Sequence, residues 1–229
     1  MKTLSQYMRL RADLYNILSA PFNVEFKESD FARLKKYVAV MSEMAKENGD
    51  SSFAADVSGL GRCIENRVDE DVIAGEFAKL FLGVNKASYT GHTITPHESV
   101  YMSESRLVMQ EPWENIYEIY YKHGIGKNKE FKEPEDHITA EMSFMAFLSR
   151  QCIEFAEIGK SEELTENLET QELFLDKHLC KWIPKLAEDV VKNTSLEFYK
   201  YLSLVVQGFI KADFKYICQL KEELSETTC

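Results

Sequence analysis

The sequence predicts an all-α fold, a single globular domain over residues 1–229 built as a bundle of about nine helices. Apolar residues make up 45% of the chain, and 14 Phe, 11 Tyr and 8 Met are enough to fill a sizeable core. Only 10 Gly and 5 Pro interrupt it, whereas an all-β chain needs a turn signal about every 8–12 residues. Along most of the chain, apolar residues recur three and four positions apart, the spacing that places them on one face of a helix.

Start and stop signals bound the helices of the first half. The first apolar stripe ends before Pro21, which does not fit a helix interior. Gly49 is typical of a helix C-cap and ends the second helix. Gly59 and Gly61 weaken the third, because each Gly costs a helix about 1 kcal/mol relative to Ala. We expect helices over residues 4–18, 29–47, 50–66 and 69–82.

The second half contains the most regular helix of the chain. Residues 84–97 lack periodicity and are predicted to form a flexible loop. Residues 134–158 keep a spacing of three to four, and Pro134 with the carboxylates after it marks a helix start. The helices expected here cover residues 98–110, 112–123, 134–158, a stretch from 161 that kinks at Pro184, and 195–223.

Charge and targeting signals limit the possible partners. The chain carries 27 Lys and Arg against 38 Asp and Glu, a net charge of −11, which disfavours nucleic acid and anionic membranes. The N-terminus has no apolar signal-peptide region, and no apolar run reaches the ~18 residues of a membrane span. The five cysteines form no C-x-x-C pair and are expected to be reduced thiols. We therefore expect a cytoplasmic protein with no stable membrane insertion.

No motif for catalysis or cofactor binding is present. His97-Glu98 begins like the zinc motif H-E-x-x-H, but Tyr101 stands where the second His belongs. No His has a Glu three residues before it, as di-iron bundles require, and phosphate loops and nucleophile elbows are also missing. We expect no enzyme activity, metal or cofactor. The alternative is a metal-binding helical hydrolase that uses His92, His97, Glu98 and His137.

Four ionisable residues gather at the start of the most regular helix. We expect Glu133 to cap this helix, Glu135 and Asp136 to occupy its first turn, and His137 to share a face with Glu141. Carboxylates there stabilise a helix by about 0.3–1 kcal/mol each and need no further function. The functional alternative is a cluster that binds guanidinium groups through bidentate hydrogen bonds.

Three sequence blocks follow one another in the chain. They are Leu80-Phe81-x-Gly83 followed by Pro96-x-Glu98-Ser99-Val100-Tyr101, then residues 133–138 with 141–145, then Phe174-x-x-x-His178-Leu179-x-x-Trp182-x-Pro184. The middle block resembles the E-P-x-D-H signature of the TorD/DmsD/NarJ family of redox-enzyme maturation chaperones, and the other two resemble further blocks of that family. The resemblance covers roughly residues 10–220.

The resemblance implies a cytoplasmic all-α chaperone that binds the twin-arginine leader of a molybdenum-cofactor oxidoreductase, such as a trimethylamine N-oxide or dimethyl sulfoxide reductase. Such a chaperone holds the apoenzyme until the cofactor is inserted. The leader is basic and then apolar, which suits an acidic cluster beside an apolar groove. We expect a monomer or a homodimer that exchanges helices. The predicted leader-binding residues are Pro96, Glu98, Ser99, Tyr101, Trp113, Glu133, Pro134, Asp136, His137, Glu141 and Phe144, with the apolar groove near Tyr101, Trp113 and Phe144.

Overall fold

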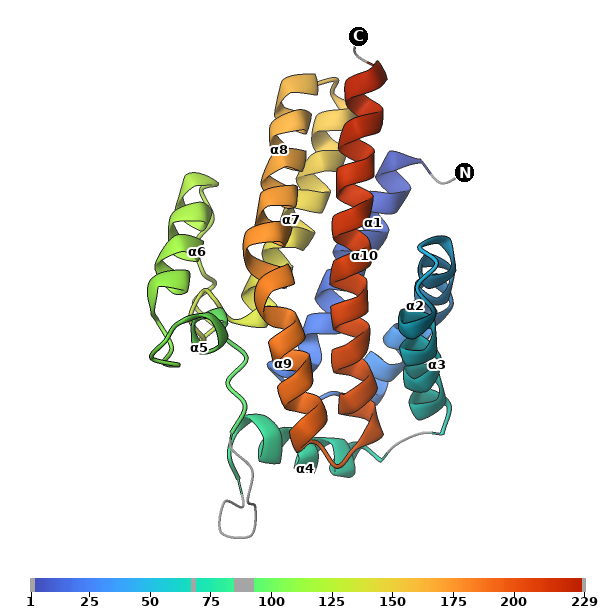
Figure 1. Cartoon of the computed structure of the whole chain (residues 1–229), viewed down its shortest axis with the longest axis vertical. Helices are drawn as coiled ribbons and strands as arrows, with labels where there is room; N and C mark the ends of the chain where they lie inside the picture. The colour runs from blue at the N-terminus through green and yellow to red at the C-terminus, as the bar shows by residue number, and fades with distance from the viewer. Residues whose placement is uncertain (1–2, 67–68, 85–92, 228–229) are drawn as a thin grey trace.

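The computed structural model describes residues 3–66, 69–84 and 93–227, and it confirms the all-α fold. Four helices form the centre of the bundle (Figure 1). Helix α1 packs against α7, α7 against α8, and α8 against α10. Their bounds are Leu4–Ser19 for α1, Ile138–Glu157 for α7, Ser161–Phe174 for α8 and Glu197–Thr227 for α10.

Shorter helices cover the flanks of this centre. Helices α2 (Glu28–Glu47) and α3 (Ser51–Glu65) pack against each other, and α3 also packs on α10. Helices α5 (Glu98–Met102) and α6 (Glu111–Lys122) pack together on the opposite flank. Helix α4 (Glu70–Phe81) runs across one end of the bundle, at the bottom of Figure 1.

Helices α8 and α9 belong to one continuous rod. A π-helical turn, Leu175–Leu179, joins the end of α8 to α9 (Cys180–Asn193) without a break. With this rod counted once, the helical segments in the described part of the chain number nine, as predicted. The sequence placed the irregularity at Pro184, but Pro184 lies inside α9 and the departure from α-helical geometry precedes it.

Two predicted boundaries are wrong. Residues 98–110 are not one helix, because α5 ends at Met102 and the chain then passes through left-handed conformations at Arg106 (φ 53°) and Met109 (φ 56°). Helix α7 begins at Ile138 and not at Pro134. The predicted loop at residues 84–97 lies largely outside the described residues. In its described part, buried Ile94 donates its N–H to the Leu80 carbonyl at 2.8 Å.

Glycine allows close packing between α3 and α10. A Cβ atom on Gly208 of α10 would lie 2.3 Å from the Phe53 ring of α3, and one on Gly59 of α3 would lie 2.4 Å from the Tyr201 ring of α10. Each helix therefore offers a glycine to an aromatic ring of the other. The presence of Gly59 in α3, which weakens the helix locally, is therefore explained by the close approach of the Tyr201 ring.

A buried ion pair joins the first and last helices. The Arg11 Nε and Nη2 atoms of α1 donate to the two carboxylate oxygens of Asp213 in α10, at 2.5 and 2.8 Å. Tyr15 donates to the same carboxylate, and Arg11 also donates to Gln171 Oε1 at 2.7 Å. Burial alone lowers the pKa of Arg11, but the Asp213 carboxylate raises it above its usual value.

In the described part of the chain, no helix is long and apolar enough to cross a membrane.

Candidate functional site

Residues 133–137 turn at Glu135 and Asp136, where His137 N donates to the Pro134 carbonyl at 3.2 Å, and they pair with the residues before α5. Glu98 N donates to the Asp136 carbonyl at 2.9 Å, and Ile138 N donates to the Pro96 carbonyl at 3.0 Å. These bonds flank an antiparallel bridge between His97 and His137. The segment therefore precedes α7 and is not its first turn.

The expected capping roles are therefore corrected. His137 is the N-cap of α7, and its Nδ1 atom accepts from Thr139 N at 3.1 Å. Glu133 does not cap this helix, and Glu135 and Asp136 are not in its first turn. The physical reason is that the backbone of the segment forms a turn and bonds to residues 96–98, so the helical hydrogen bonds of α7 begin at the His137 carbonyl.

Asp136 supports α5 instead of α7. Its side chain is fully buried, and Oδ2 accepts from Ser99 N at 2.9 Å in the first turn of α5. The Ser99 hydroxyl in turn accepts from Gln110 N at 3.1 Å, which fixes the start of α6. Oδ1 of Asp136 has no hydrogen-bond partner within the described residues. This carboxylate thus positions two helices and is closed to a ligand.

Two more buried carboxylates bind α9 and the π-helical turn to the same region. Glu98 Oε2 lies 2.9 Å from His178 Nδ1 in the π-helical turn, and Glu141 Oε2 accepts from Trp182 Nε1 at 3.0 Å. Burial raises the pKa of Glu98, and burial together with the Glu98 charge raises the pKa of Glu141 well above its usual range. His178 and Trp182 belong to the third sequence block, but the predicted site did not include them.

His97 and His137 are also buried, with ring centroids 4.8 Å apart in an edge-to-face arrangement. Burial, and then the neighbouring His97, lower the pKa of His137 to about 3. Burial also lowers the pKa of His97, although the nearby Asp136 and Glu133 carboxylates oppose this. His97 Nε2 lies 3.4 Å from Glu133 Oε2, within ion-pair distance but without hydrogen-bond geometry.

Only two carboxylates of the 133–137 segment reach solvent. The side chain of Glu133 is 44% exposed and that of Glu135 is 15% exposed. Glu135 Oε2 accepts from Trp113 Nε1 at 2.7 Å, while Oε1 lies 3.6 Å from Lys127 Nζ. Lys127 also donates to the Glu133 carbonyl at 2.9 Å. The Glu135 carboxylate is therefore already paired with a lysine of the same protein.

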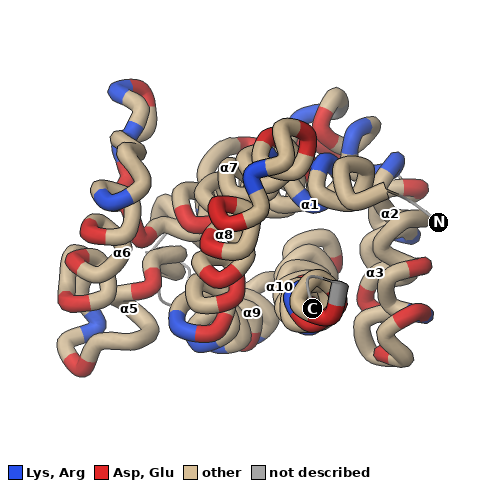
Figure 2. Tube along the Cα trace, turned by 90° about the horizontal axis from the view of Figure 1, so that it is seen from above, with Lys and Arg blue, Asp and Glu red and all other residues tan. Residues whose placement is uncertain are grey.

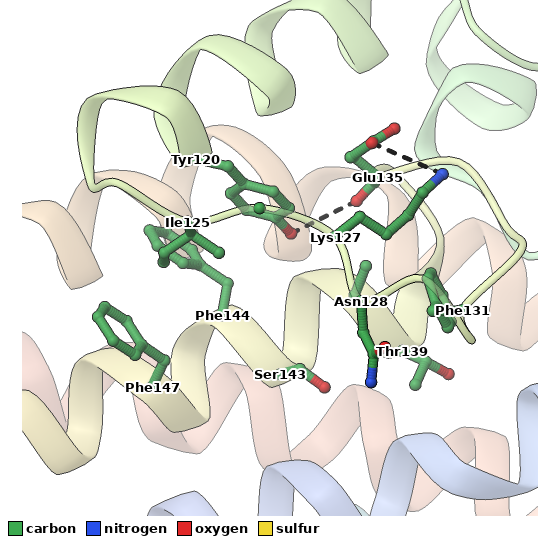
Figure 3. Close-up of a pocket in the computed structure, with 12 residues that line it drawn as sticks. Tyr120, Ile125, Lys127, Asn128, Phe131, Glu135, Thr139, Ser143, Phe144 and Phe147 are labelled. Atoms are coloured by element: carbon green, nitrogen blue, oxygen red, sulfur yellow. Dashed lines mark hydrogen bonds and ion pairs between the residues drawn. The ribbon is translucent and has the colours of Figure 1, made fainter.

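An apolar pocket of about 270 Å³ opens beside Glu135, between α7 and the segment that follows α6 (Figure 3). Phe144 and Phe147 point toward it from α7, and the Tyr120 hydroxyl donates to the Glu135 carbonyl at 3.4 Å. Lys127 and Glu135 stand together at its edge. The pocket is lined by Tyr120, Ile125, Gly126, Lys127, Asn128, Phe131, Glu135, Thr139, Ala140, Ser143, Phe144 and Phe147.

Of the three aromatic residues predicted to share a groove, Phe144 lines the pocket and Trp113 donates to Glu135 at its edge. Tyr101 lies elsewhere, with its ring stacked on Trp182 at 5.8 Å between centroids and its hydroxyl 3.0 Å from Asp189 Oδ2. The prediction missed Phe131, one of the few apolar residues in the Lys-rich stretch after α6, which was the available signal.

Of the four residues of the alternative metal-dependent hydrolase, His92 lies outside the described residues. Within residues 3–66, 69–84 and 93–227, no group of three or more His, Cys, Asp and Glu side chains could hold a metal ion. His97, Glu98 and His137 are buried, and Glu98 is bonded to His178.

Comparison with known proteins places the chain in a family. The family model described as nitrate reductase delta subunit matches residues 46–188. Chaperone protein TorD of Vibrio atlanticus is 26% identical over 223 residues, covering 95% of this chain and 99% of the relative. Chaperone protein TorD of Vibrio cholerae is 27% identical over 229 residues, covering 97% and 99%.

A solved structure is also similar, a putative redox enzyme maturation protein from Archaeoglobus fulgidus. It has 16% identity and a TM-score of 0.47, covering 92% of this chain and 96% of that one. The curated relatives are named chaperones, which agrees with the expectation that this chain is not an enzyme. The matched region spans more than half of the sequence and includes all three blocks. The chain therefore belongs to the nitrate reductase delta subunit family, which includes TorD and related redox-enzyme maturation chaperones.

Proposed function

We propose that this protein is a cytoplasmic chaperone that binds the twin-arginine leader of a molybdenum-cofactor oxidoreductase of the trimethylamine N-oxide or dimethyl sulfoxide reductase type. It holds the apoenzyme for cofactor insertion before export. The observation that carries the proposal is the apolar pocket with the Glu135 carboxylate at its edge. An apolar pocket near the half-exposed Glu133 carboxylate is complementary to a peptide that is basic and then apolar.

The two parts of the pocket contribute differently to binding. The rings of Phe131, Phe144 and Phe147 offer apolar area to the second half of the leader, where each buried CH₂ contributes about 0.8 kcal/mol. The half-exposed carboxylate of Glu133, within a net charge of −11, attracts the basic half. Affinity therefore depends mainly on the pocket, and charge favours the encounter.

The buried residues of the predicted site have a supporting role in this proposal. Glu98, Ser99 and Asp136 join α5 to the 133–137 segment, and Glu141 joins α7 to α9. Together with Pro96 and His137 they hold the segment that carries Glu133, Pro134 and Glu135. They position the peptide site without contacting the peptide.

Filling the pocket tests the proposal. Ser143 is exposed on α7 and lines the pocket, so Ser143→Trp fills it without disturbing the core. We expect this change to weaken binding of a synthetic leader peptide by at least about tenfold in calorimetry, equivalent to about 1.4 kcal/mol. Ser58→Trp makes the same change at an exposed position of α3 on the opposite flank and serves as the control.

Equal affinity of the two variants for the leader would show that the pocket is not its site. A wild-type protein that binds no basic and apolar leader would contradict the proposed function itself. Capture of client proteins from anaerobically grown cells then names the client. We expect a molybdenum-cofactor oxidoreductase that the Ser143→Trp variant does not retain.

A further inference from the structure

Exposed apolar side chains concentrate in one short stretch of the protein. Among the described residues, six of the 12 exposed large hydrophobic side chains lie between residues 102 and 121. These are Met102, Leu107, Val108, Met109, Tyr117 and Tyr121. Exposed apolar residues scattered singly need no explanation, but a gathered and exposed set marks an interaction surface. Helices α5 and α6, which bound the stretch, lie at one edge of the molecule (Figure 2).

The loop in this stretch has a defined conformation. Arg106 and Met109 both have positive φ, which is costly for residues with a Cβ atom unless the surroundings enforce it. Gln110 Nε2 donates to the Val108 carbonyl at 3.0 Å, and the Ser105 hydroxyl donates to Gln110 Oε1 at 3.1 Å. Side-chain hydrogen bonds therefore fix the backbone of this loop. In this conformation the Leu107 and Met109 side chains are 61% and 53% exposed.

Helix α6 carries an aromatic stripe beside an acidic one. Trp113, Tyr117 and Tyr121 follow at intervals of four residues, and the Trp113 and Tyr117 rings lie 5.6 Å apart. Glu114 and Glu118 are also four residues apart on the adjacent face, and both are exposed. Neither forms an ion pair with another residue of the described part of the chain.

Most of the other carboxylates near the pocket are not available to a cation. Asp136, Glu98 and Glu141 are buried, and Glu135 is already paired with Lys127. Glu133 also reaches solvent, and Glu114 and Glu118 are exposed beside the aromatic residues of the same helix. Trp113 connects the two areas, because its Nε1 atom donates to Glu135 while its ring contacts the Tyr117 ring at a tilt of 34°.

We propose that the two arginines of the leader bind on the exposed face of α6, to Glu114 and Glu118 and over the rings of Tyr117 and Tyr121. This rests on the proposed function and assigns the basic half of the leader to a different place from its apolar half. A guanidinium group combines bidentate hydrogen bonding to carboxylate with stacking on an aromatic ring, and a lysine ammonium does not. The face offers both kinds of partner side by side, next to the pocket.

Neutralising the α6 pair tests the proposal. The double variant Glu114→Gln/Glu118→Gln removes two charges from α6, and Glu162→Gln/Glu166→Gln removes two at the same spacing from exposed positions of α8. Each protein is titrated with a leader peptide and with its twin-lysine counterpart. We expect wild type to prefer the arginine peptide by about tenfold. The α6 variant should bind it about tenfold more weakly and lose the preference, whereas the α8 variant should keep the preference.

A preference for arginine that survives in the α6 variant overturns this assignment. If the same protein still loses affinity through Ser143→Trp, the proposed function stands and only the place of the arginines is wrong. If wild type binds the leader without any preference for arginine, the assignment also fails. Absence of all leader binding overturns both proposals.

Discussion

Glu141 shows how strongly single residues are constrained at the centre of this fold. It is fully buried, its Oε2 atom accepts from Trp182, and its Oε1 atom has no partner within the described residues. Burial and the nearby Glu98 charge raise its pKa well above the usual range. A carboxyl group in such surroundings favours the protonated form, which neutralises the charge that burial penalises.

This raised pKa predicts a pH-dependent effect of Glu141→Gln. A group whose folded-state pKa is raised contributes stability that is present below its unfolded pKa and is lost as the pH rises. Glutamine keeps the oxygen that accepts from Trp182 but cannot ionise. We therefore expect the free energy of unfolding of the variant, relative to wild type, to increase from about pH 4 to about pH 8. Urea unfolding at several pH values measures it, and Glu154→Gln at an exposed position of α7 should show no such trend.

At the scale of secondary-structure elements, α3 and α10 are held close by two small residues. The Phe53 ring fills the space at Gly208 and the Tyr201 ring fills the space at Gly59. Phe53 is 2% exposed and is surrounded by the core, so its ring cannot move aside at low cost.

Gly208→Ala is accordingly expected to destabilise the protein by up to about 2 kcal/mol, because overpacking a core costs about 1–3 kcal/mol. The gain of about 1 kcal/mol that alanine normally gives a helix offsets part of this cost. Gly75→Ala in α4 is the matched control, because no atom lies within 4 Å of the added Cβ. It should stabilise the protein by about 0.5–1 kcal/mol. Chemical unfolding of both variants measures these changes, and a stabilised Gly208→Ala would contradict the close packing.

Local signals predicted the bodies of the helices but not the junctions at the site. Apolar spacing and terminators such as Pro21 and Gly49 place the helices within a few residues of their bounds. The carboxylates after Pro134 match the sequence pattern of a helix start. The Asp136 side chain instead accepts a hydrogen bond from Ser99 N, 37 residues earlier in the chain. The π-helical turn keeps an apolar spacing close to that of an α-helix. Such long-range partners leave no local signal.

The lack of a local signal for long-range contacts also explains which site residues could be predicted from the sequence. Glu133 and Phe144 could be identified because they lie in a block with a recognisable pattern. The pocket also needs Ile125 and Phe131, which reach α7 only after the segment following α6 folds onto it. Their role depends on tertiary structure.

At the scale of the whole molecule, the two ends of the chain are joined through the Arg11–Asp213 pair, which spans 202 residues. Both side chains are almost completely buried, at 3% and 1% exposed. Removal of one partner leaves a charge without compensation in the core. A buried ion pair in this position holds α1 and α10 in one arrangement.

Asp213→Ala is therefore expected to lower the free energy of unfolding by about 3–5 kcal/mol. The double change Arg11→Met/Asp213→Leu should recover much of this loss, because it also removes the unpaired charge. Glu188→Ala, which removes a fully exposed partner of Lys192, should produce no measurable change. Thermal and urea unfolding measure the free energy of unfolding of the three variants. A double variant that is no more stable than Asp213→Ala would contradict the role of the unpaired charge.

In the ion pair between Lys127 and Glu135, the lysine competes with any cationic ligand for the Glu135 carboxylate. Only seven residues separate Lys127 from Glu135, and a short tether keeps such a group at an effective concentration on the order of millimolar. Free amines and stray lysine-rich peptides at lower concentrations therefore seldom occupy this carboxylate. A ligand displaces the lysine only when other contacts hold it in place, so occupancy of Glu135 becomes a consequence of binding rather than its cause.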